Sequence, residues 1–155
     1  MARYVVVLPL SELATGEVFA VDAWPLHVTL VEPFDAPAPP EVVDAALAAA
    51  LRGTLPVHAT VGEADRFGRH RDVPVRLIRD GGALGALRSA VLASLAGTDA
   101  RLERIRRDYR PHVTVRHADL RAGALVILDH VALVDTRPAD GAHHRHVLAV
   151  HALEG

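Results

Sequence analysis

The amino-acid sequence predicts an α+β fold in which an antiparallel sheet carries two helices on its outside. The chain has several short β-branched runs but only two amphipathic helical stretches, and it lacks the regular strand–helix alternation of a parallel sheet. The elements also follow in a similar order in the two halves, which indicates an internal pseudo-repeat. A length of 155 residues fits one compact domain, and we expect residues 1–155 to form it.

Two strands are expected in the first forty residues. Residues 3–8 are apolar and β-branched and precede a proline, which is typical of a buried strand. Residues 10–25 are mixed in polarity and are interpreted mostly as loop, and residues 26–31 are the second strand candidate. Residues 33–40 carry four prolines, so we expect no regular structure there.

Two segments have the apolar spacing of helices. Residues 41–52 follow prolines and end before Gly53, a residue that favours helix termination. Residues 83–96 precede Gly97 and carry an apolar stripe that consists of Leu84, Leu87, Val91, Leu92 and Leu95.

The remaining strand candidates complete the order of elements. They are residues 57–64, 73–79, 112–116, 126–135 and 146–153. Residues 99–110 are rich in arginine and form either a helix or an ordered loop. Strands and helices are therefore mixed along the chain, as the predicted fold class requires.

Composition excludes several classes of protein. There is no cysteine, so disulfides, thiolate zinc sites and cysteine nucleophiles are excluded, and there is no lysine to form an adenylate in an ATP-dependent ligase. The formal net charge of −2 does not suit a generally basic nucleic-acid coat or a polybasic membrane binder. No apolar run is long enough for a membrane span. We expect a cytoplasmic protein, a monomer without an obligate protein partner, that requires no cofactor.

Two His-x-Thr motifs lie about half the chain apart. His27 and Thr29 belong to one strand candidate, and His112 and Thr114 belong to another. Side chains two residues apart on a strand point to the same face, so each motif presents an imidazole and a hydroxyl together while its aliphatic neighbours face a core. A third copy begins at His58, but it has no counterpart in the other half of the chain. We interpret His58 as an ordinary strand histidine.

The paired motifs resemble those of the 2H phosphoesterase superfamily, which includes the 2′-5′ RNA ligase (LigT-like) proteins and 2′,3′-cyclic phosphodiesterases. The resemblance covers nearly the whole chain, and it rests most on the sequences Pro25-Leu26-His27-Val28-Thr29-Leu30 and Tyr109-Arg110-Pro111-His112-Val113-Thr114-Val115. The segment before His27 is short for the first helix of the family. The resemblance implies two pseudo-symmetric lobes of antiparallel sheet that flank a central cleft, with one motif from each lobe.

The chemistry of this family explains the two histidines. Hydrolysis of a 2′,3′-cyclic phosphate, at an RNA terminus or on a nucleotide, needs a base for the attacking water and an acid for the leaving ribose oxygen. His27 and His112 are the catalytic candidates for a metal-independent reaction, because imidazole populates both protonation states near neutral pH. Thr29 and Thr114 are the candidates to bind the phosphate. Either histidine suits either role, and the roles exchange if the reaction reverses to join RNA ends through a 2′-5′ bond.

Further substrate contacts are expected near the second motif. Arg116 lies two residues beyond Thr114, so strand alternation places it on the cleft face, as an additional phosphate contact. The arginines of residues 99–110 form either a solvated face or a basic lip beside the cleft. The aromatic candidates to stack on a base are Tyr109, Trp24, Phe34 and Phe67, although most of them are expected in the core. The histidines at 143, 144 and 146 are interpreted as a solvated loop rather than a metal site.

Two alternatives remain open at the level of sequence. The first is a non-catalytic module that binds RNA or a nucleotide in the same cleft, and it predicts binding that survives substitution of either histidine. The second is a structural domain without a ligand, in which the histidines contribute only to stability.

Overall fold

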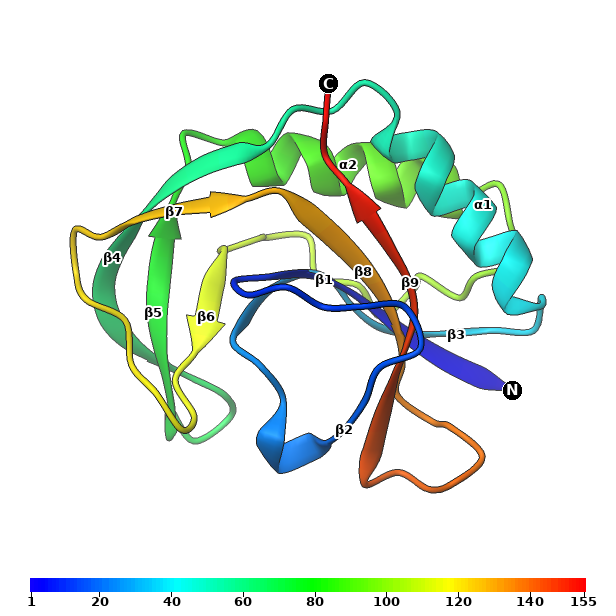
Figure 1. The fold of residues 1–155 in the computed structure, drawn as a ribbon, viewed down its shortest axis with the longest axis horizontal. Coiled ribbons are helices and arrows are strands. Elements are labelled where there is room, and N and C mark those ends of the chain that lie inside the picture. The colour runs from blue at the N-terminus through cyan, green and yellow to red at the C-terminus, as the bar shows by residue number, and fades with distance from the viewer.

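A computed structural model describes all 155 residues and arranges them as one nine-stranded sheet with two helices against one face (Figure 1). The strand order is β2-β9-β8-β1-β3-β6-β5-β4-β7, and every pairing is antiparallel. The strands are β1 (Ala2–Pro9), β2 (Val18–Ala20), β3 (His27–Ala36), β4 (Val57–Phe67), β5 (Val73–Arg79), β6 (His112–Thr114), β7 (Leu125–Leu128), β8 (His130–Asp135) and β9 (His144–Ala152). The predicted α+β class with an antiparallel sheet is confirmed.

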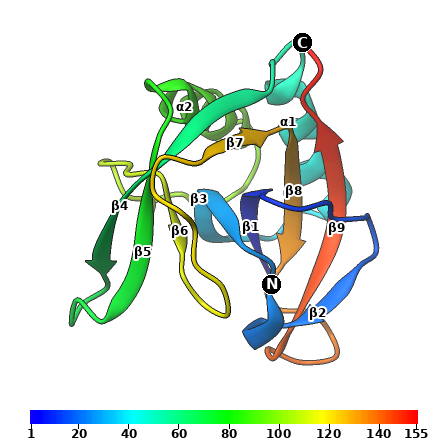
Figure 2. The same cartoon turned by 60° about the vertical axis from the view of Figure 1, so that its left-hand side comes forward.

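The sheet consists of two lobes that meet at one narrow junction (Figure 2). The N-terminal lobe contains β2, β9, β8, β1 and β3, and the second lobe contains β6, β5, β4 and β7. The two lobes are joined where β3 pairs with β6, through the single Cα partnership of Val28 with Val113. Because this junction lies inside both His-x-Thr motifs, the sheet brings the two motifs side by side.

The predicted strand at 126–135 is two strands in different lobes. Residues 125–128 pair with β4, whereas residues 130–135 pair with β1 and β9, and only Asp129 separates the two. The chain therefore passes from one lobe to the other at Asp129, where the backbone oxygen accepts a hydrogen bond from the Leu153 amide at 2.7 Å. A continuous apolar run cannot show such a change of partners, because periodicity reports burial and not pairing.

The expectation of irregular structure at 33–40 is correct only for residues 37–39, because β3 continues to Ala36 and helix α1 (Pro40–Leu51) begins at Pro40. Tyr4 opposes Phe34 and Val6 opposes Val31, so two residues of β3, Glu32 and Pro33, oppose one residue of β1. Pro33 thus occupies a bulge, where its missing N–H breaks no ladder bond. Prolines at the start of α1 are tolerated, since the first helical N–H groups have no partner within the helix.

The segment at 10–25 is mostly loop, as predicted, but it also forms β2 and a short 3-10 helix at Val21–Ala23. Strand β2 pairs with β9 at the sheet edge, which is a contact between distant parts of the chain. The segment covers the inner face of the N-terminal lobe, where Leu13 and Trp24 pack on Val5 and Val7 of β1 in a small apolar cluster. This packing explains why β1 is buried on both faces.

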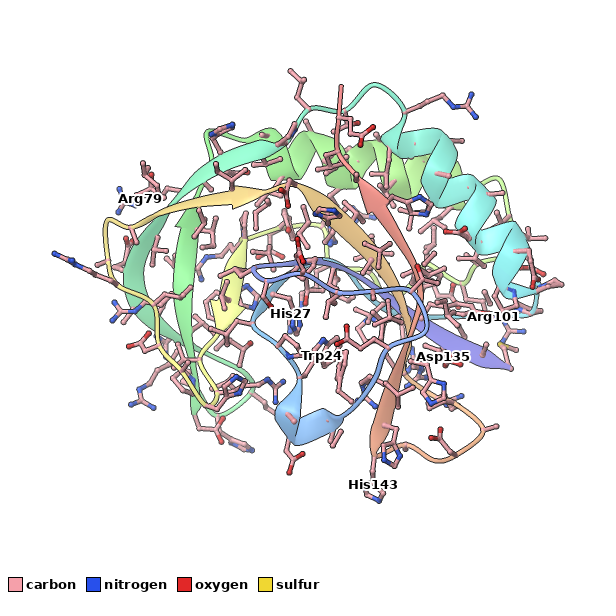
Figure 3. All side chains as sticks on the ribbon, viewed as in Figure 1. Trp24, His27, Arg79, Arg101, Asp135 and His143 are labelled. Atoms are coloured by element: carbon pink, nitrogen blue, oxygen red, sulfur yellow. The ribbon has the colours of Figure 1, made fainter.

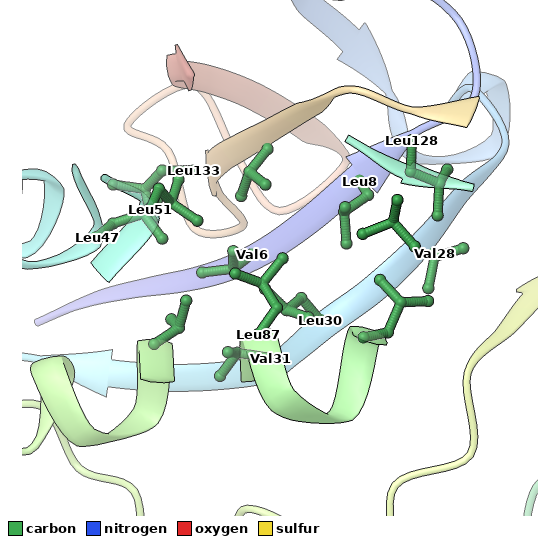
Figure 4. Packing of buried hydrophobic residues seen from close by; sticks show 14 of the residues in the cluster. Val6, Leu8, Val28, Leu30, Val31, Leu47, Leu51, Leu87, Leu128 and Leu133 are labelled. Atoms are coloured by element: carbon green, nitrogen blue, oxygen red, sulfur yellow. The ribbon is translucent and has the colours of Figure 1, made fainter. Parts of the chain in front are cut away.

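The main core lies between the sheet and the two helices, α1 and α2 (Ala83–Leu95) (Figure 4). Val28 and Leu30 of β3 point into this core and are completely buried. Strand alternation therefore directs His27 and Thr29 to the opposite face. Both helices agree with the predicted segments to within one residue at each end, and Gly53 follows α1 with a left-handed φ of +74°. Residues 99–110 are an ordered loop without a helix.

We predict that Leu30→Ala will destabilise the protein far more than Leu125→Ala. Leu30 is completely buried beneath the first motif, and a cavity at such a site costs about 2–5 kcal/mol of the free energy of unfolding. Leu125 is 83% exposed, so its truncation should change that free energy by no more than about 0.5 kcal/mol. Urea titrations followed by circular dichroism measure both values. Equal losses in the two variants would contradict the assignment of the core.

Candidate active site

The register at the lobe junction places four polar side chains in a compact group. Because Val28 opposes Val113 in an antiparallel pair, His27 opposes Thr114 and Thr29 opposes His112. Directly opposed residues have Cβ atoms about 4.5–5.5 Å apart, and diagonal neighbours are separated by about 7–8 Å. The two histidines are diagonal neighbours. Each histidine therefore has one threonine directly opposite it and another two residues along its own strand.

The same kind of local hydrogen bond orients each of the two imidazoles. The Nδ1 atom of His27 donates to the carbonyl oxygen of Pro25 at 2.8 Å, and that of His112 donates to the carbonyl oxygen of Arg110 at 2.7 Å. A carbonyl oxygen only accepts, so the proton of each neutral ring resides on Nδ1. Each Nε2 is then left with a lone pair and without a partner in the protein. This is the state that a general base needs.

Burial dominates the protonation of both rings. It lowers the pKa of His27 to about 4, and the positive charges of Arg116 and of a protonated His112 act in the same direction. Burial also lowers the pKa of His112, and Arg110 and Arg106 add to the effect. Both histidines are therefore neutral at pH 7 when the site holds no anion.

Each histidine also rests against an aromatic ring that in turn faces an arginine. Trp24 stacks on His27 with 4.3 Å between ring centroids, and the two residues lie together inside the curl of the sheet (Figure 3). The guanidinium carbon of Arg145 lies 5.5 Å from the centre of Trp24. In the other lobe, Phe67 meets His112 edge to face at 4.4 Å, and Arg110 lies 4.8 Å from the Phe67 ring. The pseudo-symmetry of the lobes thus extends to the support of the two rings.

Two of the four aromatic base-stacking candidates are buried. Phe34 is 2% exposed and packs against Tyr4 in the core, so that candidate is wrong. Trp24 is also buried, and its ring contacts His27 and Arg145, although the residue lines the smaller cavity beside His27. Phe67 and Tyr109 are half-buried and line a cavity beside His112. They are the two aromatic rings that a nucleobase in this cavity would meet.

Two cavities flank the four motif residues. The larger, of about 630 Å³, lies on the His112 side, and six of its lining residues are arginines: Arg66, Arg69, Arg71, Arg88, Arg106 and Arg110. The smaller, of about 380 Å³, is lined by His27, Thr114 and Arg116 among others. Thr29 lines both cavities, so the two cavities lie on either side of the motifs. Arg116 lies beyond the end of β6, yet it faces the cleft as the alternation of residues predicted.

The loop at 99–110 contributes part of the basic cleft. Arg106 and Arg110 line the larger cavity, whereas Arg101 lies away from it and bridges to Asp35 through the backbone. Tyr109 donates its hydroxyl hydrogen to the backbone oxygen of Thr29 at 2.8 Å, and burial raises its pKa, so this hydroxyl stays protonated. Tyr109 therefore has a structural contact with the first motif, in addition to the substrate contact that the sequence predicts.

A buried arginine holds this loop against the first motif, and the sequence interpretation did not identify it. Arg88 of α2 is 4% exposed, donates to the backbone oxygen of Leu30 at 2.9 Å and to Glu32, and donates to the backbone oxygen of Arg106 at 2.6 Å. Its guanidinium also lies 4.7 Å from the centre of the Tyr109 ring. The sequence contains one indication of this network, namely a charged residue next to Leu87 on the apolar stripe of a helix. A charge that is buried at such a position needs a partner.

The other histidines lie outside this group. His58 is exposed on β4 and pairs with Ile127, as expected of an ordinary strand histidine. His146 contacts Asp140 at 2.8 Å in the region interpreted as a loop, and β9 in fact begins at His144. No three His, Asp or Glu side chains come together in a way that could hold a metal ion. Neither helix has the length and apolar character needed to cross a membrane.

Comparisons with known proteins agree with this architecture. The model of the 2′-5′ RNA ligase superfamily matches residues 12–146, so the chain belongs to that superfamily, whose members are phosphoesterases and RNA ligase-like enzymes. No curated protein matches the chain. The crystal structures that share its fold include a phosphoesterase (17% identity, TM-score 0.64, 99% of both chains covered), E. coli LigT complexed with 3′-AMP (18%, 0.62, 99% of both) and TT0787 of Thermus thermophilus (21%, 0.63, 100% of this chain and 99% of that one).

We predict that Arg88→Met will lower the free energy of unfolding by about 1.5–3 kcal/mol, which is the usual contribution of hydrogen bonds to a charged group. Methionine fills a similar volume but leaves Glu32 and the Arg106 carbonyl without their donor. Chemical denaturation measures the loss, and Arg104→Met, at an exposed position in the loop at 99–110 that Arg88 holds, is the matched control. A variant as stable as wild type would show that the network does not hold the loop.

Nuclear magnetic resonance of ¹⁵N-labelled histidine tests the protonation states. We expect His27 and His112 to carry their neutral-state proton on Nδ1, and His27 to titrate near pH 4 because burial lowers its pKa. Saturating inorganic phosphate should raise the pKa of both rings, since a nearby anion favours the cation. A titration of His27 near pH 6.5 that phosphate leaves unchanged would contradict the described site.

Proposed function

We propose that the protein is a metal-independent phosphoesterase that hydrolyses a 2′,3′-cyclic phosphate, at an RNA terminus or on a nucleotide, to a phosphomonoester. The observation that carries this proposal is the pair of histidines at the lobe junction, each with Nδ1 bonded to a backbone carbonyl and Nε2 free. Their diagonal placement suits a phosphorus atom held between them, with an attacking group on one side and a leaving group on the other.

The two proton transfers follow from this arrangement. One neutral imidazole takes a proton from water through Nε2 while the water oxygen bonds to phosphorus. The other imidazole, protonated at Nε2, gives its proton to the ribose oxygen as the bond between that oxygen and phosphorus breaks. The product is a phosphomonoester next to a free hydroxyl. Each transfer typically contributes about 10²–10⁴-fold to the rate.

The threonines and arginines support the charge that accumulates on phosphorus. Thr29 and Thr114 alternate with the histidines across the junction, which supports the proposal that their hydroxyls donate to the non-bridging oxygens. The arginines of the larger cavity make the site locally positive although the chain carries a formal net charge of −2. A local field of this sign attracts a phosphate-bearing substrate without favouring long nucleic acid.

Substrate binding also produces the protonated histidine that acts as the acid. Both histidines are neutral in the free site because burial lowers their pKa values. An anionic phosphodiester between them raises both pKa values, and one ring then takes up a proton from solvent. Proton uptake is thereby coupled to the arrival of the substrate, and the repulsion between two cationic rings keeps the second ring neutral as the base.

The size and lining of the larger cavity favour a nucleotide. A volume of about 630 Å³ accommodates a nucleoside, and Phe67 and Tyr109 offer aromatic surface for a base. The likeness in fold to E. coli LigT complexed with 3′-AMP supports a ligand of this size. With a 5′-hydroxyl in place of water, the same two proton transfers would form a bond from the 5′ oxygen to phosphorus and release the 3′ oxygen as a hydroxyl. The RNA ends would then be joined through a 2′-5′ bond, as expected of a ligase-like member.

We predict that the protein hydrolyses 2′,3′-cyclic nucleotides in excess EDTA and that His27→Ala and His112→Ala each lower kcat by about 10²–10⁴-fold, because each removes one proton transfer. His58→Ala is the matched control, since it removes the histidine of the third His-x-Thr sequence at an exposed position. Product formation is followed by chromatography, and circular dichroism verifies that every variant is folded.

Two results would count against this function. If folded wild type turns over none of the four cyclic nucleotides and no RNA terminus, but still binds a nucleotide after either histidine is replaced, the cleft belongs to a binding module. If the activity disappears in EDTA and returns with a divalent metal, the reaction does not depend on the two imidazoles alone.

A further inference from the structure

The smaller cavity, beside His27, has an unusual balance of charge. It is lined by four arginines, Arg3, Arg116, Arg137 and Arg145, and by no aspartate or glutamate. It shares His27, Thr29 and Thr114 with the motifs, so it opens directly from the proposed position of the cyclic phosphate. The catalytic step proposed above uses none of the four arginines. Their gathering on this side therefore calls for a separate explanation.

Two of the four arginines are balanced by a carboxylate outside the cavity. Arg3 pairs with Asp35 at 2.9 Å, and Arg137 approaches the same carboxylate at 3.9 Å. The contact between Arg3 and Asp35 joins the neighbouring strands β1 and β3. We therefore assign a structural role to Arg3 and Arg137. The excess charge of the cavity is thus concentrated on Arg116 and Arg145.

Arg116 and Arg145 face the cavity without a counter-ion. Neither forms an ion pair, and Arg116 makes no hydrogen bond within the protein. Burial and then the positive charge of Arg116 lower the pKa of Arg145, and the charge of Asp135 opposes them only in part. The two guanidinium groups therefore repel each other across the cavity. An anion bound between them would offset this repulsion, and the exposed side chain of Arg116 is free to reach one.

Arg145 is held firmly in this position. Its Nη1 atom donates to the backbone oxygens of Thr136, Ala142 and His144, at 3.3, 3.0 and 3.1 Å. The guanidinium also lies against Trp24, the ring that stacks on His27. Its Nη2 atom makes no hydrogen bond within the protein, and its buried Nε has no partner. A fixed cation with unused donors is typical of a site that recognises phosphate.

We propose that this cavity is a second anion subsite, in which Arg116 and Arg145 bind an additional phosphate of the same substrate. The proposal rests on the function proposed above, because the cyclic phosphate must lie between His27 and His112 for the second group to reach the cavity. The substrate class is then a 2′,3′-cyclic phosphate end that carries a further phosphate on its 5′ oxygen, such as a 5′-phosphorylated nucleotide or the last residue of an RNA strand. A bare cyclic mononucleotide leaves the subsite empty.

The test compares adenosine 2′,3′-cyclic phosphate with its 5′-phosphorylated form at constant ionic strength. For wild type we expect kcat/KM to be at least about tenfold higher for the 5′-phosphorylated substrate, as charge-assisted hydrogen bonds to one phosphate supply that much. In Arg145→Gln and Arg116→Gln the ratio of the two kcat/KM values should fall towards one. Arg121→Gln, an exposed arginine that lines neither cavity, should keep the wild-type ratio.

A binding measurement separates the subsite from catalysis. Calorimetry with adenosine 2′-monophosphate and adenosine 2′,5′-bisphosphate should show tighter binding of the bisphosphate to wild type and a smaller difference in Arg116→Gln. Arg116 makes no hydrogen bond in the protein, so this variant should remain folded even if Arg145→Gln does not.

Each outcome separates the two proposals. Hydrolysis of both substrates with equal kcat/KM would overturn the subsite and leave the proposed function intact. No hydrolysis of either substrate, together with preferential binding of the bisphosphate that is lost in Arg116→Gln, would support the subsite and overturn the catalytic proposal. No hydrolysis and equal binding would overturn both.

Discussion

The pairing of Val28 with Val113 is the constraint on which the site depends. It is the one register contact between the terminal strands of the two lobes, and the side-chain period of a strand is two residues. A slip of one residue on either strand would move its histidine and threonine into the main core and expose its valine. The complete burial of both valines opposes that slip. Packing on the helix side of the sheet therefore determines the placement of the polar group on the other side.

Around this junction, both lobes support their histidine in the same way. A backbone carbonyl two residues earlier accepts the Nδ1 proton, an aromatic ring contacts the imidazole, and an arginine faces that ring. These contacts orient each Nε2 before a substrate arrives, and the accompanying burial keeps both rings neutral. A lowered pKa means that an entering anion would favour protonation of a ring, as the proposed chemistry on a phosphodiester requires. The two lobes differ in what lies beyond the rings: one side opens into a cavity with aromatic surface and the other into a smaller one with unpaired arginines.

Much of this arrangement could be predicted from local sequence signals. The two motifs predicted which face of each strand carries the polar side chains, because alternation is a local property. The prolines before residues 41–52 and Gly53 after them predicted the two ends of the first helix. The missed features all depend on distant contacts. Pro33 fits in β3 because β1 contributes one residue fewer at that point. The apolar run that begins at Leu125 divides into two strands because its halves pair in different lobes. Strand β2 forms only because it pairs with β9. Arg88 is buried because Glu32 and the Arg106 carbonyl accept its hydrogen bonds, and neither contact is visible along the chain.

The most direct test of the account is the structure of the protein crystallised with a nucleoside 2′,3′-cyclic vanadate, whose five-coordinate vanadium mimics phosphorus during the displacement. We predict vanadium between the Nε2 atoms of His27 and His112, one near the attacking oxygen and the other near the leaving oxygen. The hydroxyls of Thr29 and Thr114 should donate to the remaining oxygens, while both Nδ1–carbonyl hydrogen bonds persist. A vanadate bound by only one of the histidines, or bound away from the lobe junction, would contradict the claim that the register of β3 and β6 assembles a two-histidine site.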